Sequence, residues 1–252
     1  MDPVIAVALA GLGAILGSFV CVVAERAYTG QSFVQGRSRC NSCARDLGPL
    51  DLIPVISYVL ARGRCRGCGA KVPALYLIVE AVLSGMFVLA YLSLGLSLTL
   101  LAFLSALVVL AFIVVYDVRH TVVPSVASSL LVFFGACAAV LAAQSLYDLG
   151  VACVIAGFIA LGLFLLHVCS RGRAMGLGDT PVALGLSLLT APYAYGGLLL
   201  SFWIGAVIGI LILVLRRGGP RMGIEVPFVP FLAAGYLVAY FFSWNPLEIV
   251  VW

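Results

Sequence analysis

The sequence predicts an all-α, polytopic membrane protein with about eight transmembrane helices, and its composition is the first reason. Of the 252 residues, 64% are hydrophobic and 10% are charged, whereas soluble chains carry about 25% charged residues. The second reason is that the apolar residues form long runs, which polar segments separate and of which only 74–94 contains a charged residue, Glu80. One polar segment, residues 25–73, is long enough to form a small loop domain.

Most expected helices are apolar runs close to the roughly 20 residues that a transmembrane helix needs. The first run, 4–24, has no positively charged residue before it, so we expect a retained helix rather than a cleavable signal peptide. The other clear runs predict spans at 74–94, 96–116, 122–144, 151–169 and 228–244.

The run 181–215 is too long for one crossing. As a single helix it would measure about 52 Å, well beyond the hydrocarbon thickness of about 30 Å. Pro192 and the Gly196-Gly197 pair lie near its middle and are typical helix breakers. We therefore expect two short spans here, which brings the total to eight.

The charges predict the orientation of these spans. All 14 Lys and Arg residues fall in alternate loops, whereas the opposite set of loops contains Asp2, Asp148 and Glu248. The positive-inside rule then places the basic loops in the cytoplasm and both termini outside. A single crossing by 181–215 would move the arginines at 216–221 to the outside, so eight spans fit the rule and seven do not.

Two carboxylates are expected at the same depth in the membrane. Asp117 follows the third predicted span and Asp179 begins the sixth, so both lie at the cytoplasmic boundary. A pair of this kind can activate water, because the ionised acid accepts a proton from water while the protonated acid polarises the scissile carbonyl. Gly176 and Gly178 beside the second acid would let an extended peptide approach closely, which suggests a substrate-positioning role.

Each acid also has a simpler interpretation. Asp179 is well placed to be the N-cap of a helix whose first turn contains Pro181. Asp117 could be an interfacial acid that pairs with Arg119 or His120.

The polar segment carries a metal-binding pattern. Cys40-x2-Cys43 is followed by Cys65-x2-Cys68, a spacing that suits one tetrahedral zinc ion with four cysteine ligands. We expect the zinc to be structural, because four protein ligands leave no open position and the loop is too short and polar to fold around its own core. Redox chemistry of the cysteines is the alternative.

Two further ionisable residues lie within predicted spans. Glu80 is expected roughly 9 Å from the cytoplasmic end of the second span, and an acid at that depth is a functional candidate. Its alternatives are a polar helix contact or a pair with a buried basic group. We expect His167, near the end of the fifth span, to be a hydrogen-bonded histidine and not a ligand.

Together these residues resemble the type IV prepilin peptidases of pilus and type II secretion systems, which are proteases of the Gly-x-Gly-Asp class. The resemblance covers nearly the whole chain and is carried by these motifs: Gly17-Ser18-Phe19, Arg37-Ser38-x-Cys40-x2-Cys43, Asp51-x-Ile53-Pro54-x2-Ser57-Tyr58, Arg62-Gly63-Arg64-Cys65-x2-Cys68-Gly69, Val79-Glu80-x4-Gly85, Asp117-x6-Pro124, Gly176-x-Gly178-Asp179 and Pro227-Phe228-x-Pro230-Phe231.

The resemblance implies a bifunctional enzyme of the bacterial inner membrane. Such enzymes cut the basic leader from prepilin-like and pseudopilin-like precursors after a glycine on the cytoplasmic face, and Asp117 and Asp179 would be the catalytic pair. They then methylate the new N-terminus with S-adenosylmethionine, a task that the resemblance assigns to the cysteine loop with Glu80 and Arg26. The bilayer and the precursors are the expected partners, and no nucleic-acid partner is expected.

The same resemblance suggests three functional parts. Residues 1–24 would be the first transmembrane helix, residues 25–73 the zinc-binding cytoplasmic loop with its methylation role, and residues 74–252 the transmembrane peptidase core.

Three positions depart from the family pattern. Cys21 replaces the usual Asn, Tyr28 replaces the usual Pro, and Pro181 stands where Lys is common. The first two fall in the methylation half, so a peptidase without methyltransferase activity stays an alternative. Two other classes also stay open.

The first of these other functional classes is a proton-coupled transporter that uses Asp117, Asp179 and Glu80. The sequence shows none of the internal repeats that are common in transporters. The second is an inactive assembly protein whose cysteine loop binds partners. Asp→Asn substitutions would leave such a scaffold working but would abolish a protease.

Overall fold

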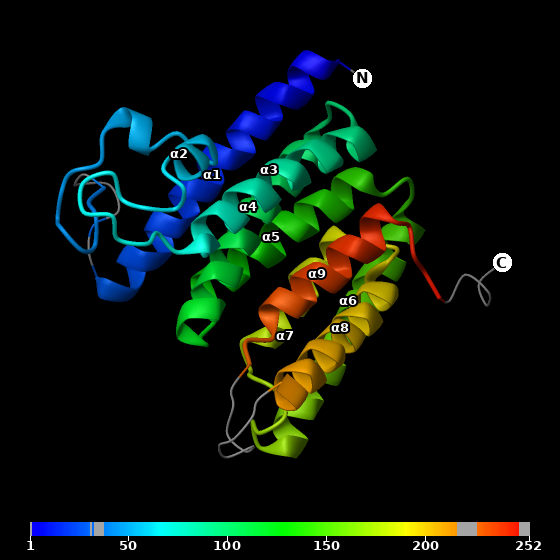
Figure 1. Ribbon diagram of the computed structural model, residues 1–252. Helices are drawn as coiled ribbons and strands as arrows, with labels where there is room; N and C mark the ends of the chain where they lie inside the picture. The colour runs from blue at the N-terminus through cyan, green and yellow to red at the C-terminus, as the bar shows by residue number, and fades with distance from the viewer. Residues whose placement is uncertain (1, 31, 33–37, 216–225, 247–252) are drawn as a thin grey trace. The chain divides into compact units, whose positions relative to one another are not determined.

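The computed structural model describes residues 2–30, 32, 38–215 and 226–246 (Figure 1). Within these residues the regular structure is helical, with two isolated β-bridges and no strand. The chain divides into two compact units, Met1–Gly95 and Leu96–Trp252. The expected all-α class is confirmed.

The first unit is built on two helices that pack side by side, α1 (Pro3–Thr29) and α3 (Ala74–Leu94) (Figure 1). A Cβ atom at Gly17 would lie 2.9 Å from the Cα atom of Glu80, so only glycine allows the helices to approach this closely. The connection between them contains a short 3-10 helix, η1 (Pro49–Asp51), and a short α-helix, α2 (Ile56–Leu60). This connection contains the four-cysteine pattern.

The second unit contains six helices among the described residues: α4 (Leu98–His120), α5 (Ser125–Ala142), α6 (Leu146–Ser170), α7 (Asp179–Leu189), α8 (Ala194–Leu215) and α9 (Val229–Phe241). Helix α7 packs against α5 and α6, and α9 packs against α8 and α4. Of the 11 residues of α7, most are buried. A buried hydrogen bond of 2.9 Å between the hydroxyls of Ser187 and Tyr236 links α7 to α9.

Six of the described helices are long and apolar enough to cross a membrane. The expected break in 181–215 is confirmed at Pro192, because α7 ends at Leu189 and α8 begins at Ala194. Gly196 and Gly197 do not break the chain but lie inside α8, which has 22 residues and is therefore not the expected short span. Helix α7 is only about 17 Å long and α9 about 20 Å, so neither reaches the hydrocarbon thickness of about 30 Å. The total of eight crossings therefore stays a prediction.

Several helix ends differ from the expected ones. Helix α1 continues to Thr29 with Arg26 in its last turn, where a cation suits the negative end of the helix dipole. Helix α4 continues to His120, so Asp117 lies inside its last turn and not beyond it. Helix α6 begins at Leu146 because the Ser145 hydroxyl accepts a hydrogen bond from the Asp148 amide at 3.1 Å.

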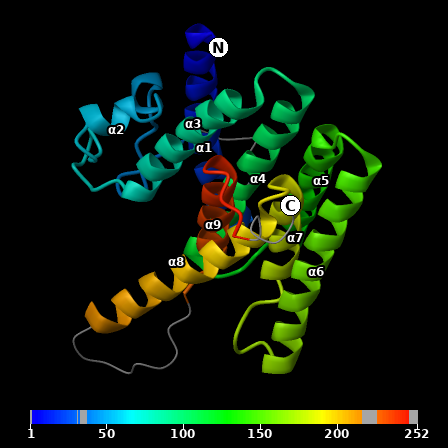
Figure 2. The same ribbon diagram turned by 90° about the vertical axis from the view of Figure 1, so that its right-hand side faces the viewer.

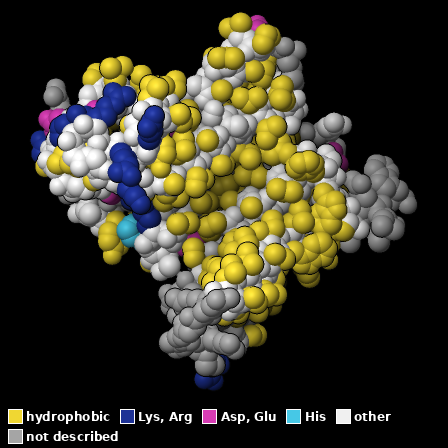
Figure 3. All heavy atoms as spheres, viewed as in Figure 1, with side chains coloured by type: hydrophobic (Ala, Val, Ile, Leu, Met, Phe, Trp, Pro, Cys, Tyr) yellow, Lys and Arg dark blue, Asp and Glu magenta, His cyan; other side chains and the backbone are white. Residues whose placement is uncertain are grey.

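The exposed surface of the helices is largely hydrophobic, as a lipid-facing surface should be (Figure 3). Helix α8 diverges from α6 toward its C-terminal end (Figure 2), and its buried residues lie only in its first half. These features agree with a multi-pass membrane protein. The arginines at 216–221, which supported the count of eight spans, lie outside the described residues.

Candidate aspartyl site and metal centre

Asp117 and Asp179 come together in the second unit, although 61 residues of chain separate them. Asp117 lies in the last turn of α4, and Asp179 is the first residue of α7. Their residues are 5% and 7% exposed, and their carboxylates are close enough for the charges to interact. Two buried acids of this kind are a rare arrangement, because burying one charge near another is costly unless a proton is shared.

Asp117 is held in place by a third helix. Its Oδ2 atom accepts a hydrogen bond of 3.2 Å from the backbone N–H of Val229, which is 112 residues away at the start of α9. The first N–H groups of a helix have no partner within that helix, so an acid is favourable at this position. Asp117 therefore fixes the start of α9, and α9 fixes one oxygen of Asp117.

The structure places Asp179 inside the first turn of α7, and Gly178 takes the cap position without a side-chain hydrogen bond. The interpretation of Asp179 as the N-cap is therefore wrong. Gly178 has a packing role, because a Cβ atom there would lie 2.7 Å from the Cβ atom of Val123. Val123 belongs to the segment that follows α4, so Gly178 lets the two acid-bearing segments meet. A Cβ atom at Gly176 would lie 3.4 Å from Oδ2 of Asp179.

Replacing Gly178 with Ala is expected to lower any activity of this acid pair by at least about tenfold, since a 1 Å displacement in an active site can cost about 100-fold. The new methyl group would push the 176–179 loop away from Val123. The measurement is the turnover of the purified variant. Gly157→Ala is the matched control, because nothing lies within 4 Å of a Cβ atom at that position of α6. Equal activity of the two variants would contradict this packing role.

His167 positions the same loop. It lies near the end of α6, and its Nδ1 atom is 2.9 Å from the backbone carbonyl oxygen of Met175. A carbonyl only accepts, so Nδ1 carries the proton and donates. The expectation of a hydrogen-bonded histidine is confirmed, but sequence reasoning missed its partner, the residue directly before Gly176.

Replacing His167 with Leu is expected to lower the turnover number about tenfold and leave the KM for substrate unchanged. The substitution leaves the carbonyl of the buried Met175 without its donor, which costs about 1–3 kcal/mol. His167→Asn is the matched variant, because its amide can donate to the same carbonyl and should restore most of the turnover. Equal losses in both variants would show that His167 acts through packing alone.

The four cysteines of the first unit form one cluster. The Sγ atoms of Cys40, Cys43, Cys65 and Cys68 all lie within 4.8 Å of one another, and those of Cys40 and Cys68 are 3.8 Å apart. A zinc ion with four sulfur ligands at about 2.3 Å requires sulfur–sulfur distances of about 3.8 Å. The cluster therefore fits a tetrahedral metal ion and could bind one.

Backbone amides favour the thiolate form of two of these sulfurs, whereas hydrogen bonds with the other cysteines and burial raise the pKa of Cys68 to about 11. The N–H groups of Cys43 and Ser42 lower the pKa of Cys40 to about 6, and those of Cys68 and Gly67 lower the pKa of Cys65. Hydrogen bonds of this kind favour the thiolate, which is the form that binds a metal. The lowered pKa values therefore favour metal-binding thiolates at Cys40 and Cys65 even without a metal.

The two cysteine turns are built alike and are joined by one acid. Each turn closes with a β-bridge, Arg39 with Asp46 and Arg64 with Lys71. Asp51 forms ion pairs with Arg45 of the first turn and with Arg66 of the second. The distance from Asp51 Oδ1 to Arg66 Nε is 3.5 Å. This acid holds the two halves of the cluster together.

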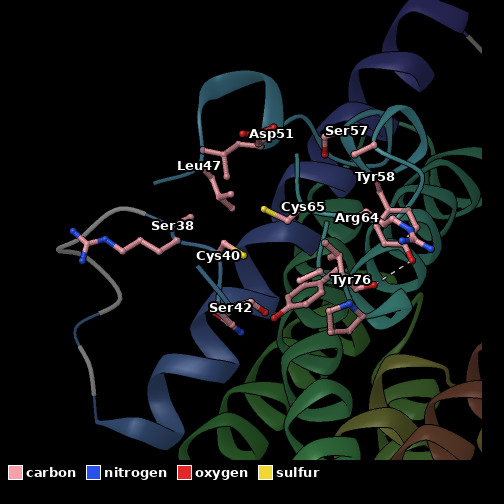
Figure 4. A pocket seen from close by; sticks show the side chains of 18 of the residues that line it. Ser38, Cys40, Ser42, Leu47, Asp51, Ser57, Tyr58, Arg64, Cys65 and Tyr76 are labelled. Carbon is pink, nitrogen blue, oxygen red and sulfur yellow. Dashed lines mark hydrogen bonds between the residues drawn. The ribbon is translucent and has the colours of Figure 1, made fainter. Parts of the chain in front are cut away.

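A cavity of about 490 Å³ lies beside the cluster and is lined by both cysteine turns, α1 and α3 (Figure 4). Cys40, Cys65 and Tyr76 lie around it. Its volume falls in the range of small-molecule sites, about 300–1,000 Å³. Sequence reasoning missed Glu25 on its wall, whose carboxylate accepts from the Tyr76 hydroxyl at 2.9 Å and from the Asn41 amide at 3.1 Å.

Glu80 and Arg26 also line this cavity. The carboxylate of Glu80, which is 7% exposed, accepts the backbone N–H of Val55 at 2.7 Å. Arg26 donates to the Ser32 carbonyl at 3.2 Å. Both side chains thus hold the connection between α1 and α3 against the helices.

Comparisons with known proteins identify the family. Residues 12–94 match the family model described as the bacterial peptidase A24 N-terminal domain. A prepilin leader peptidase/N-methyltransferase of Myxococcus xanthus is 33% identical over 226 residues, covering 87% of this chain and 67% of that protein. The chain belongs to the prepilin leader peptidase/N-methyltransferase family.

Other members of this family agree. The relative from Bacillus subtilis is 29% identical over 92% of both chains, and the relative from Dichelobacter nodosus is 32% identical over 79% of this chain and 69% of that protein. No solved structure matches. The region matched by the family model lies within the first unit, which contains the cysteine cluster and the cavity, whereas Asp117 and Asp179 lie in the second unit.

Proposed function

We propose that this protein removes the basic leader from a type IV prepilin-like precursor at the cytoplasmic membrane surface and then methylates the new N-terminus. The observation that carries the peptidase is the meeting of two buried acids, Asp117 and Asp179, from helices far apart in the sequence. Family membership supports it, because the relatives are named for both activities.

The two acids would hydrolyse the peptide bond after a glycine by sharing one proton. The ionised acid takes a proton from water as the water oxygen attacks the scissile carbonyl carbon, while the protonated acid gives its proton to the carbonyl oxygen. The proton taken from water then passes to the leaving amine as the C–N bond breaks, and the other acid takes back the proton of the carbonyl oxygen as the C=O bond re-forms. The Val229 amide keeps Asp117 oriented through these steps. Gly176 would leave room for the substrate backbone beside Asp179, whereas Val123 fills the space at Gly178.

Methylation is proposed for the cavity of the first unit. S-adenosylmethionine, when bound there, would supply an electrophilic methyl group and leave as the neutral thioether S-adenosylhomocysteine, and the new N-terminal amine of the cleaved precursor would be the nucleophile. That amine arrives protonated, and Glu25 on the cavity wall is placed to accept its proton. Glu80 and Arg26 would shape the cavity through Val55 and Ser32.

The metal in this proposal is zinc, and its role is structural. Cys40, Cys43, Cys65 and Cys68 would fill all four positions of a tetrahedral ion, so the metal would hold the cavity wall and take no part in transfer.

The proposed placement follows the charges. The loop 25–73 would lie in the cytoplasm, both termini outside, and residues 74–252 would form the peptidase core in the bacterial inner membrane. The transporter alternative loses support, because Glu80 already has a local role in holding Val55. A peptidase without methylation stays a second candidate, because Cys21 and Tyr28 depart from the family pattern.

The test is the intact mass of a prepilin-like precursor after incubation with the purified protein in lipid nanodiscs and S-adenosylmethionine. We expect a product that has lost its leader and gained one methyl group. A precursor with Val in place of the glycine before the cut should stay intact. An unchanged wild-type precursor would contradict the peptidase, and a cut but unmethylated product would select the second candidate.

A further inference from the structure

The polar connection of the first unit exposes a row of large hydrophobic side chains. We define the α2 surface as Leu50, Leu52, Ile53, Ile56, Val59 and Leu60, which are 39–70% exposed. These residues lie on η1, on α2 and between them, outside the predicted membrane spans. An exposed apolar patch beside a membrane helix indicates a contact with lipid or with another protein.

The α2 surface is held near the level of the bilayer boundary by Glu80. Helix α3 has 21 residues and is about 32 Å long, so it needs nearly its full length to cross about 30 Å of hydrocarbon. Glu80 lies about 9 Å along α3 from its first residue. Since Glu80 accepts the amide of Val55 at 2.7 Å, the residue before α2 is drawn to this depth and not left in water.

Val55 also has an unusual backbone conformation. Its φ angle is 62°, a conformation that a β-branched residue rarely adopts. The Glu80 carboxylate holds the amide of that same residue.

Basic residues border the α2 surface. Arg62, Arg64, Arg66 and Lys71 follow it in the sequence, and Asp51, the acid on η1, is paired with Arg45 and Arg66. Hydrophobic and basic side chains lie next to each other over this loop (Figure 3). Apolar residues bordered by Arg and Lys are typical of segments that lie in the interface of an anionic membrane.

We propose that the α2 surface inserts into the headgroup–acyl boundary of the membrane, with anionic phospholipid as its partner. The apolar side chains would contact the acyl chains, and Arg62 and Arg64 would contact the phosphates. The lipid would then hold the outer wall of the cavity, because Leu52, Ser57 and Tyr58 of the same segment line it. This proposal depends on α1 and α3 crossing the bilayer and not on either enzymatic activity.

The test is photo-crosslinking from the benzoyl-phenylalanine variant of Leu60, with the 252-residue chain in nanodiscs of phosphatidylcholine and phosphatidylglycerol. Intact-mass and peptide mass spectrometry identify what is captured. The matched control is the same photo-label at Ala44, an exposed position of the first cysteine turn outside the α2 surface. We expect lipid adducts at least about five times more frequent at position 60, with phosphatidylglycerol enriched about twofold over its share of the lipid.

Capture by residues of Leu96–Trp252, by a second copy or by an added precursor in place of lipid would overturn the proposal. Equal lipid capture at the two positions would also overturn it. The paired substitution Arg62→Gln and Arg64→Gln tests the headgroup. It should keep the lipid adducts and remove the enrichment of phosphatidylglycerol, whereas an unchanged enrichment would overturn the assignment of anionic lipid to these arginines.

Discussion

Replacing either Asp117 or Asp179 with Asn should abolish leader removal, with cleavage rates at least about 1,000-fold below wild type, within the range of general acid–base catalysis. Asn keeps the shape of the side chain but can neither take a proton from water nor share one with the other acid. Removing one of two neighbouring buried charges lowers their repulsion, and an Asn at position 117 can still accept from the Val229 amide, so stability should fall little. The measurement is precursor cleavage by purified variants in lipid.

Asp148→Asn is the matched control for these variants. Asp148 lies at the start of α6, where its carboxylate accepts from the Ser145 hydroxyl at 2.8 Å and is exposed. Its variant should cut as fast as wild type. Rapid cleavage by Asp117→Asn or Asp179→Asn would contradict the paired-acid mechanism, whatever the control does.

Replacing Cys40 and Cys65 with Ser should remove the bound metal and the methyl transfer together, and leave cleavage largely intact. One ligand is lost from each cysteine turn, and metal binding supplies about 10–16 kcal/mol to small four-ligand sites. We expect the zinc content to fall from about one ion per chain to less than about a tenth. Cleavage should persist because both acids lie in the other compact unit.

Cys153→Ser combined with Cys169→Ser is the control for this experiment. Both are exposed cysteines on α6, outside the cluster. Metal analysis by mass spectrometry should show full zinc content in the control. Full zinc content in the Cys40 and Cys65 variant would exclude the cluster as the metal site.

The helices could largely be predicted from the lengths of the apolar runs, and the places where the prediction fails have physical causes. The span 74–94 matches α3 residue for residue, since polar or turn residues stop it at both ends. Helix α6 starts five residues before the predicted span, because the Ser145 hydroxyl caps it and Asp148 in the first turn suits the positive end of the helix dipole. Two short helices were expected in 181–215, but the 11-residue length of α7 could not be predicted, because it depends on burial among neighbouring helices.

The two acids of the candidate site could be predicted from the sequence, but their surroundings could not. Charge asymmetry placed Asp117 and Asp179 at one depth, and the structure brings them together. Val229 and His167 could not be found this way, because their roles are backbone hydrogen bonds that depend on tertiary contacts. The α2 surface could not be predicted from the sequence, because its few apolar residues lie within a loop that is polar overall.

The most direct test of the central claim is one intact-mass measurement across three proteins, each incubated with precursor and S-adenosylmethionine. Wild type should give a cut and methylated product, Asp179→Asn an uncut precursor, and the Cys40 and Cys65 double variant a cut but unmethylated product. This pattern would assign the two reactions to two separate sites. Cleavage by Asp179→Asn, or full methylation by the cysteine variant, would contradict the account.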